Sequence, residues 1–479
     1  MRYLGSKESL TDQIIQLLHE KEIAQNDLIF CDAFCGMGSV SDSIKGIYNH
    51  VVVNDSLKCS TIFTLGKLYA NSCTFNKLGF DPFEFLNENN NKIKGFIFKN
   101  YSLGGSKRMY FSADNAARID FFRLQIEEWK LIGKLTDEEY VYLLACLLES
   151  VSNVSNTAGV YGAFLKHWDS RALKPIVFSR INVAEGICQN VTSFNDKIEN
   201  IIEDIDCDIL YLDPPYTQNQ YGTQYHLLET IILNDDPVIS RVTGSRPTGP
   251  MRSNWSKMYH AHILFDKVIS ETKAQHIILS YNNDGFMSRD FIESTLKRYG
   301  KVDSYCCKEI DYKKYNNTKC KGAEGHCEYL FYIHKKPVGD LIVESPLNYT
   351  GNKFKLLKQI LPYLNNQSDT FIDIFAGSGL VGLNSDCKRI ILNDYNEITV
   401  SLLNYFKDGT SESIIDRMDN IIKEYNLTDT YRNGKDFYPE EKHEGLSRYN
   451  KEAFNKLKKD YNESRDINLL FALIIFGFN

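Results

Sequence analysis

The sequence predicts an α/β fold with a doubly wound sheet, and three observations support it. Short apolar runs alternate with amphipathic stretches along the first part of the chain, as in sheets whose parallel strands are joined by helices. A glycine-rich turn follows the first of these runs. A similar opening recurs near residue 350, and a repeat of this length indicates a duplicated domain.

Five apolar runs have the length of buried strands. They lie at 28–30, 51–53, 209–212, 276–281 and 328–333. Continuous apolar runs are typical of parallel strands that are covered on both faces. Helical patterns lie between them, for example at 10–18 and 141–151. Ligands of such sheets bind at the carboxyl ends of the strands, so the polar residues that follow these runs are expected to share one cleft.

The length of 479 residues indicates more than one domain, because a single hydrophobic core rarely serves so long a chain. A polar joint at 335–340 contains Pro337 and Gly339, which interrupt helices and strands. We therefore expect a first domain at 1–337, a linker at 338–340 and a second domain at 341–479.

The composition narrows the class of protein. A hydrophobic content of 43% is ordinary for a globular protein, and no apolar run reaches the roughly 18 residues of a membrane helix. The N-terminus does not have the pattern of a signal peptide. The 12 cysteines show no metal-ligand spacing, so no metal site is predicted. With a net charge of -7, any nucleic acid would have to bind a local basic surface.

The glycine-rich turn, DAFCGMGS at 32–39, is a candidate cofactor site. Gly36 and Gly38 let the backbone pass close to a ligand where a Cβ would clash. Asp55 follows the next apolar run, and its carboxylate could accept hydrogen bonds from both hydroxyls of a ribose. The turn lacks the third glycine of a dinucleotide site and the G-K-[ST] of a phosphate-binding loop, so neither of those sites is expected.

The second copy repeats both parts of this pattern. RYLGSK at 2–7 corresponds to NYTGNK at 348–353, and DIFAGSGL at 373–380 corresponds to the first glycine turn. An Asn-Asp pair follows in each copy and ends at Asp55 or Asp394. The repetition favours a ligand-binding role over an ordinary tight turn.

The tetrapeptide DPPY at 213–216 occurs only in the first copy. Its prolines have no backbone N–H, which leaves the Asp213 carboxylate and the Pro214 carbonyl as outward-facing acceptors. Tyr216 adds an aromatic face. Two acceptors beside a stacking ring suit a planar group with an exocyclic amine, whose nitrogen lone pair they would localise for attack on an electrophilic methyl group. A rigid loop at a strand end is the structural alternative.

In combination, these motifs resemble the Dam-like (alpha-group) DNA adenine-N6 methyltransferases. The duplicated opening resembles the tandem modification methylases of type IIS restriction systems. The resemblance implies a Rossmann-like S-adenosylmethionine-dependent methyltransferase sheet with a second, partial copy of the same fold. It also implies a flipped adenine in double-stranded DNA as substrate, a bacterial cytoplasmic location, and a cognate restriction endonuclease that acts on the same site.

The resemblance assigns roles by position. The cofactor residues would be Tyr3, Gly5, Lys7, Asp32, Phe34, Gly36, Gly38, Asp55 and Asn190. The catalytic residues would be Asp213, Pro214, Pro215 and Tyr216. The cofactor residues of the second copy would be Tyr349, Gly351, Lys353, Asp373, Phe375, Gly377, Gly379 and Asp394. Asn190 departs from the family pattern, which usually has an acidic residue there for the cofactor adenine.

A stretch without acidic residues follows the tetrapeptide at 237–265. It contains four cationic residues that we predict to contact DNA, namely Arg241, Arg246, Arg252 and Lys257. A duplex-binding methylase needs such positive charge for the phosphates. A solvated basic loop is the structural alternative.

Two other functions are compatible with these motifs. One is methylation of a different amino group, such as an RNA base or a protein glutamine amide, although the glutamine enzymes favour Asn at the place of Asp213. The other is a DNA-binding module with a decayed second site. Because 341–479 has no DPPY, we expect it to be the front half of a second domain, truncated or completed by another polypeptide, and inactive alone.

Overall fold

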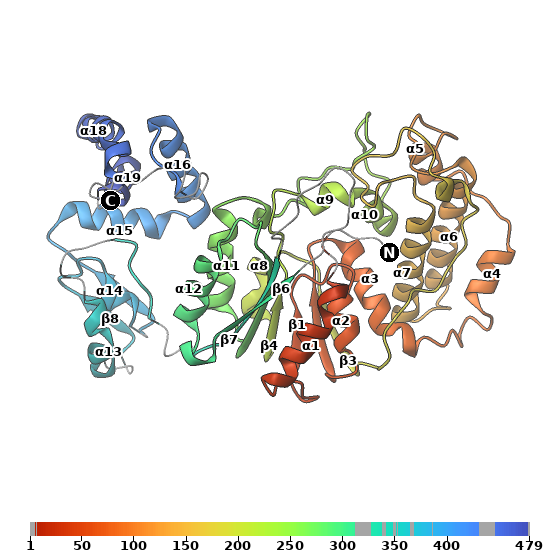
Figure 1. Cartoon of the computed structure of the whole chain (residues 1–479), viewed down its shortest axis with the longest axis horizontal. Coiled ribbons are helices and arrows are strands. Elements are labelled where there is room, and N and C mark those ends of the chain that lie inside the picture. Colours follow the sequence, from red (N-terminus) through yellow and green to blue (C-terminus); the bar gives the residue numbers. More distant parts are fainter. Residues whose placement is uncertain are drawn as a thin grey trace. The chain divides into compact units, whose positions relative to one another are not determined.

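The structure is a computed structural model that describes residue 5 and residues 7–311, 327–337, 342–347, 351, 353–364, 368–385, 387–430 and 446–477. The chain divides into two compact units, Met1–Lys336 (unit 1) and Pro337–Asn479 (unit 2) (Figure 1). Tyr3, Tyr349 and the predicted linker at 338–340 lie outside the described residues.

Unit 1 is built on a seven-stranded, mostly parallel sheet with the strand order β3-β2-β1-β4-β5-β7-β6. The strands are β1 (Ile29–Asp32), β2 (His50–Asn54), β3 (Asn190–Phe194), β4 (Ile209–Leu212), β5 (His276–Asn282), β6 (Cys306–Asp311) and β7 (Cys327–His334). The first five strands in this order, β3, β2, β1, β4 and β5, are parallel. In contrast, β7 runs antiparallel to both β5 and β6. The mixed α/β class is therefore confirmed.

All five predicted strands are present, but one of them has the opposite direction. The run at 328–333 was expected to be parallel, and β7 is antiparallel to β5. An apolar run indicates that a strand is buried on both faces, but it does not indicate whether the strand runs parallel or antiparallel to its neighbours. As a consequence, β7 begins where β5 ends, and Glu328 pairs with Asn282 at the carboxyl edge of the parallel strands.

Helices cover both faces of this sheet. One face carries α1 (Thr11–Glu20), α2 (Ser39–Ile44) and α3 (Lys58–Tyr69). There, Ile14, Val40 and Leu65 share a buried cluster with Tyr211 and Ile278. The predicted helical pattern at 10–18 falls within this layer.

The opposite face carries α8 (Ile198–Ile201), α11 (His260–Glu271) and α12 (Arg289–Tyr299). Phe265 and Ile292 pack there with Leu210 and Leu279. The two layers leave the carboxyl edge of the sheet open for a ligand.

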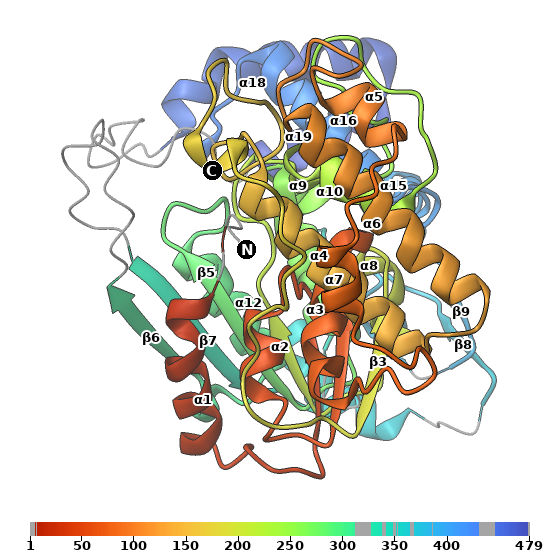
Figure 2. The ribbon, with the colours of Figure 1, turned by 90° about the vertical axis from the view of Figure 1, so that its right-hand side faces the viewer.

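A helical layer is inserted between β2 and β3 and packs against α3 (Figure 2). Its helices are α4 (Pro82–Glu88), α5 (Phe96–Tyr101), α6 (Ala113–Leu131) and α7 (Asp137–Val154), and α9 (Tyr221–Gln224) and α10 (His226–Leu233) follow β4. A Cβ on Gly66 of α3 would lie 2.3 Å from the Ala145 Cβ of α7, so glycine permits this close contact. The predicted helix at 141–151 is part of α7.

The described part of unit 2 has two parallel strands, β8 (Thr370–Asp373) and β9 (Arg389–Leu392). The α-helices described there are α13 (Leu357–Ile360), α14 (Leu380–Leu383), α15 (Glu397–Asp408), α16 (Ser411–Tyr425), α18 (Ser447–Ser464) and α19 (Ile467–Phe476). Met418, Leu457 and Ala472 belong to the core that joins α16, α18 and α19. Across the described part of both units, no helix combines the length and apolarity of a membrane span.

Candidate active site

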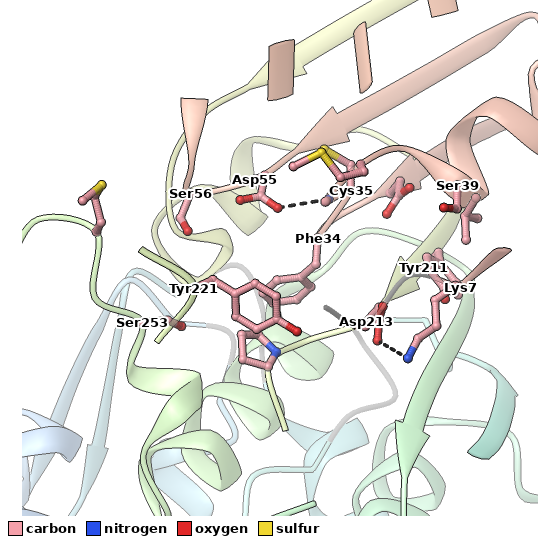
Figure 3. A pocket seen from close by; sticks show the side chains of 17 residues that line it. Lys7, Phe34, Cys35, Ser39, Asp55, Ser56, Tyr211, Asp213, Tyr221 and Ser253 are labelled. Atoms are coloured by element: carbon pink, nitrogen blue, oxygen red, sulfur yellow. Dashed lines mark hydrogen bonds and ion pairs between the residues drawn. The ribbon is translucent and has the colours of Figure 1, made fainter. Parts of the chain in front are cut away.

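An open pocket lies at the carboxyl edge of β1, β2 and β4 in unit 1 (Figure 3). Its empty space, solvent-filled mouth included, is about 770 Å³, within the range of small-molecule sites. The glycine turn, Asp55 and Asp213 all line this pocket. The prediction that they share one cleft is therefore confirmed.

The first glycine turn is fixed by contacts with its neighbours. Gly36 and Gly38 have φ angles of 49° and 66°, a region that favours glycine. The Cys35 N–H donates to the Asn54 carbonyl at 2.9 Å. A Cβ on Gly38 would lie 2.9 Å from the Thr64 hydroxyl oxygen, so α3 leaves no room for a side chain there.

Asp55 is held against this turn by two backbone donors. Its Oδ2 accepts from the Gly36 N–H at 3.1 Å and its Oδ1 accepts from the Leu57 N–H at 2.8 Å. Burial raises the pKa of Asp55 to about 6, although these two hydrogen bonds lower it. Each carboxylate oxygen keeps a second lone pair for a ligand in the pocket.

Asp32 is almost fully buried at the end of β1. Its Oδ2 accepts from the Ser41 hydroxyl at 2.6 Å, and within the described part of the chain its buried Oδ1 has no hydrogen-bond partner. Burial raises the pKa of Asp32 to about 7, and the nearby Asp213 and Asp55 carboxylates add to this shift. A cationic or N–H donor in the pocket would satisfy Oδ1.

Lys7 joins two carboxylates beneath the tetrapeptide. Its Nζ lies 3.0 Å from the Asp213 Oδ1 and also pairs with the Glu328 Oε1. Burial lowers the pKa of Lys7, but Asp213, Tyr216 and Glu328 outweigh it and hold this pKa well above its usual range. Burial also raises the pKa of Asp213, and Lys7 opposes that shift. The pKa of Asp213 is raised to about 7 even beside the Lys7 ammonium, so near neutral pH the Asp213 carboxyl is present in both its ionised and its protonated form.

Aromatic side chains surround the tetrapeptide. The Tyr216 ring packs edge-on against Tyr281 at 5.7 Å between centroids, and the Lys7 Nζ lies 5.1 Å from the Tyr216 centroid. Phe34 packs edge-on against the buried Trp255 at 5.2 Å. Of these side chains, Lys7 and Phe34 line the pocket.

Most of the predicted cofactor and catalytic residues of unit 1 that the structure describes line the pocket, and four of them do not. Gly38, Pro214 and Tyr216 adjoin it as parts of the glycine turn and the tetrapeptide. Asn190 is different, because it begins β3 and pairs with His50 at the opposite edge of the sheet. Its position does not support the predicted contact with the cofactor. The carboxyl end of β3 instead brings Asn195 to the Asp55 backbone carbonyl, to which its Nδ2 donates at 2.7 Å.

The basic segment after the tetrapeptide is held by the inserted helices. Tyr101 and Tyr110 donate to the Gly244 and Thr243 carbonyls, and Arg108 donates to the Ser240 and Arg241 carbonyls. The residues at 260–265 belong to α11 and not to a loop.

Arg246 does not fit its predicted role as a phosphate ligand. Its guanidinium donates twice to Asp235, at 3.1 and 2.7 Å, and its side chain is 11% exposed. Arg241, Arg252 and Lys257 are exposed. The positive charge that this segment presents to solvent therefore comes from those three residues.

The second glycine turn has the same hydrogen bonds as the first. The Gly377 N–H donates to the Asp394 Oδ2 at 2.8 Å, and the Ala376 N–H donates to the Asn393 carbonyl at 2.8 Å. Gly377 and Gly379 have φ angles of 51° and 72°. Of the other predicted residues of this copy, Lys353 and Gly351 are exposed, and Phe375 is 86% exposed.

Comparison with known proteins identifies the family. Residues 3–283 and 349–478 both match the model of the D12 class N6 adenine-specific DNA methyltransferases. The chain belongs to this family. It is an adenine-specific DNA methyltransferase of the restriction–modification type, and S-adenosylmethionine is its methyl donor.

Three relatives illustrate the extent of the similarity. The Type II methyltransferase M.FokI of Planomicrobium okeanokoites is 35% identical over 100% of this chain and 74% of the relative. The modification methylase StsI of Streptococcus sanguinis is 32% identical with the same coverage. The Type II methyltransferase M.NlaIII of Neisseria lactamica is 35% identical over 70% of this chain and 99% of the relative.

The pocket of this methyltransferase fits S-adenosylmethionine. Asp55 offers carboxylate oxygens to ribose hydroxyls, and the unsatisfied Asp32 Oδ1 suits the ammonium of the methionine moiety. Phe34 adds an apolar wall.

Sequence reasoning missed several residues of this site. Tyr221, Met251 and Ser253 line the pocket, and their positions after the tetrapeptide were the only local signal for them. Glu328 and Asn282 reach the site through the antiparallel pairing of β5 and β7. No local motif marks either residue.

Proposed function

We propose that the pocket of unit 1 is the site of methyl transfer and that Asp213 and the Pro214 carbonyl accept the two amino hydrogens of a flipped adenine. The position of Asp213 supports this proposal, because it lines the same pocket as the glycine turn and Asp55. A base in a duplex must leave the stack to reach such a pocket.

The residues around the pocket have different proposed roles in methyl transfer. Bound S-adenosylmethionine supplies an electrophilic methyl group on a sulfonium. Asp55 and Asp32 bind and orient it, and Asp213 localises the lone pair of the adenine N6. The N6–carbon bond would form as the carbon–sulfur bond breaks, the cofactor would leave as a neutral thioether, and N6 would give up one proton to solvent. Lys7 favours the ionised form of Asp213, which can accept the amino hydrogens.

The test is to replace Asp213 and to measure two properties of the same protein. Asp213→Ala should abolish methyl transfer to duplex DNA and leave the dissociation constant for S-adenosylmethionine within about threefold, since Asp55 and the glycine turn are intact. The control is Asp206→Ala, an 81% exposed carboxylate shortly before β4. Turnover of Asp213→Ala near that of the control would refute the assignment.

We also propose that Arg241, Arg252 and Lys257 contact DNA phosphates. They are exposed, and Met251 and Ser253 of the same segment line the pocket. Arg252→Ala should lower the slope of log affinity against log salt by about one unit. Arg246→Ala is the matched control, because its guanidinium is engaged by Asp235. Equal slopes for both variants would show that Arg252 makes no phosphate contact.

For unit 2, we propose that 341–479 is the front half of a second methyltransferase fold that holds a cofactor but transfers no methyl group. The matching turn supports cofactor binding, and the sequence of this unit contains no DPPY. Methyl transfer in this unit would require a tetrapeptide that residues 341–479 do not contain.

We further propose that the enzyme works in the bacterial cytoplasm beside a restriction endonuclease that reads the same site. Modification methylases among the relatives support this proposal. DNA prepared from cells that express the chain should resist the cognate endonuclease. Full sensitivity of that DNA, despite adenine methylation, would contradict the pairing.

A further inference from the structure

Near its start, β7 brings a buried carboxylate, Glu328, beside the end of β5 at the carboxyl edge of the parallel strands. It is 3% exposed, and its Oε1 pairs with the Lys7 Nζ. Its Oε2 accepts from the Asn282 Nδ2 at 3.3 Å. One ammonium therefore joins two carboxylates that come from different strands of the sheet.

This arrangement has more negative charge than neutralisation of Lys7 requires. Asp213 alone, 3.0 Å from the Lys7 Nζ, would form a complete buried ion pair. A second buried carboxylate costs desolvation energy, and with both carboxylates ionised the group of Lys7, Asp213 and Glu328 carries one net negative charge. Such an excess favours a role beyond structure.

The other titratable groups around Asp213 do not cancel this charge. They are Asp32 from β1, Tyr211 from β4, and Tyr216 and Tyr221 from the segment after β4. Among the described residues that line the pocket, Lys7 is the only basic side chain. The charge on Asp213 therefore depends on how Lys7 is shared.

We infer that Glu328 is a positioning residue for methyl transfer: it draws the Lys7 ammonium away from sole contact with Asp213 and so preserves the strength of Asp213 as an acceptor for the adenine amine. The inference rests on the proposed role of Asp213. Without the charge of Glu328, Lys7 would interact with Asp213 alone. Asp213 would then be a weaker hydrogen-bond acceptor for the amino hydrogens of adenine.

The test is Glu328→Gln, which keeps the size of the side chain and an oxygen that can accept from Lys7. We expect kcat to fall about tenfold, equivalent to about 1.4 kcal/mol, and KM values for DNA and cofactor to change less than twofold. Glu328 raises the pKa of Asp213. Its neutralisation should therefore move the acid limb of the kcat profile to lower pH. A purely structural contact would leave that limb in place.

Two further variants make the result decisive. Glu309→Gln is the same change on the adjacent strand β6, at a 56% exposed position, and should retain the wild-type profile. Glu328→Asp keeps the negative charge, so the acid limb of its kcat profile should lie within about 0.3 pH units of wild type. A shift of one pH unit corresponds to about 1.4 kcal/mol. Wild-type kcat and pH profile in Glu328→Gln, or the same shift in Glu328→Asp, would overturn the inference.

The companion variant Asp213→Ala separates this inference from the proposed function. If Asp213→Ala transfers methyl groups, the proposed site itself is refuted. If Asp213→Ala is inactive and Glu328→Gln behaves as wild type, only the role of Glu328 is refuted. Should Glu328→Gln fail to bind cofactor or to fold, the acid limb of Glu328→Asp decides: a displaced limb would overturn the inference, and a retained limb would support it.

Discussion

The two glycine turns of this methyltransferase have the same local geometry and different surroundings. In each, an aspartate after the second strand accepts from a glycine N–H, Gly36 to Asp55 at 3.1 Å and Gly377 to Asp394 at 2.8 Å. The local sequence therefore suffices to form the turn.

The contacts beyond the turn differ. Lys7 is buried between two carboxylates, whereas Lys353 is exposed and its Nζ donates to the Gly351 carbonyl at 2.9 Å. β1 lies between β2 and β4, whereas β8 pairs only with β9 in the described sheet. The comparison teaches that the same local turn lies in a buried setting where β4 to β7 complete the sheet, and in an exposed setting where the described sheet has only β8 and β9.

The largest difference in methyl transfer between matched variants of the two units is expected for the lysines Lys7 and Lys353. Lys7→Ala would leave two buried carboxylates unpaired, at a cost of about 3–5 kcal/mol, so methyl transfer should fall at least about a hundredfold. Lys353→Ala removes an exposed side chain and should change transfer by less than twofold. Methyl transfer and thermal unfolding of both variants check this contrast, and comparable losses in the two would contradict it.

The two aspartates of the turns should respond differently to pH. Burial raises the pKa of Asp55 to about 6, whereas the N–H groups of Asn396 and Gly377 lower the pKa of Asp394. The proposed binding of the ribose by Asp55 and of the ammonium by Asp32 requires ionised carboxylates, and the pKa of Asp32 is raised to about 7. Binding of S-adenosylmethionine at unit 1 should therefore weaken as the pH falls from about 7 through about 6, by up to about tenfold per pH unit for each carboxylate. Binding at unit 2 should stay constant over that range.

Calorimetric titration with S-adenosylmethionine at several pH values checks this prediction. Asp55→Ala leaves only the unit 2 site to observe, and Asp394→Ala leaves only the unit 1 site. A flat pH profile in Asp394→Ala would show that Asp55 is not the titrating ligand.

A smaller effect is expected from the phenylalanines. Phe34 packs on the buried Trp255, and such edge-on pairs contribute about 0.5–1.5 kcal/mol beyond their area burial. Phe375 is 86% exposed, so Phe375→Ala should leave the unfolding free energy within about 0.5 kcal/mol of wild type. Chemical denaturation of Phe34→Ala and Phe375→Ala measures the difference. A loss of unfolding free energy in Phe375→Ala larger than in Phe34→Ala would mean that Phe375 is covered by other groups in solution.

The sequence predicts the central strands of unit 1 well. β1, β2 and β4 are apolar because helices cover both of their faces, and that burial is visible as continuous apolar runs. The edge strand β3 was not predicted, because its residues are half-buried or exposed and include polar side chains. Because β3 is not visible in the sequence, the sequence does not reveal that Asn190 begins this strand and so lies at the edge of the sheet opposite the pocket.

The candidate site was predictable where its residues belong to a local motif. The glycine turn, Asp55 and Asp213 follow strands, Gly5 and Lys7 belong to the opening motif, and all of them line one pocket. Glu328 is far from Asp213 in the sequence and reaches it only because β7 is antiparallel to β5. The pairing of Arg246 with Asp235 likewise depends on the folded path of the loop, which charge composition does not reveal.

The most direct test of the account is strand-resolved sequencing of methylated adenine in DNA from cells that express this chain or its Asp213→Ala variant. The account places the only methyl-transfer site of this chain in unit 1. It predicts methylated adenine on one strand of an asymmetric site with the wild-type chain, and no methylated adenine with Asp213→Ala. Methylation of either strand that survives Asp213→Ala would contradict it.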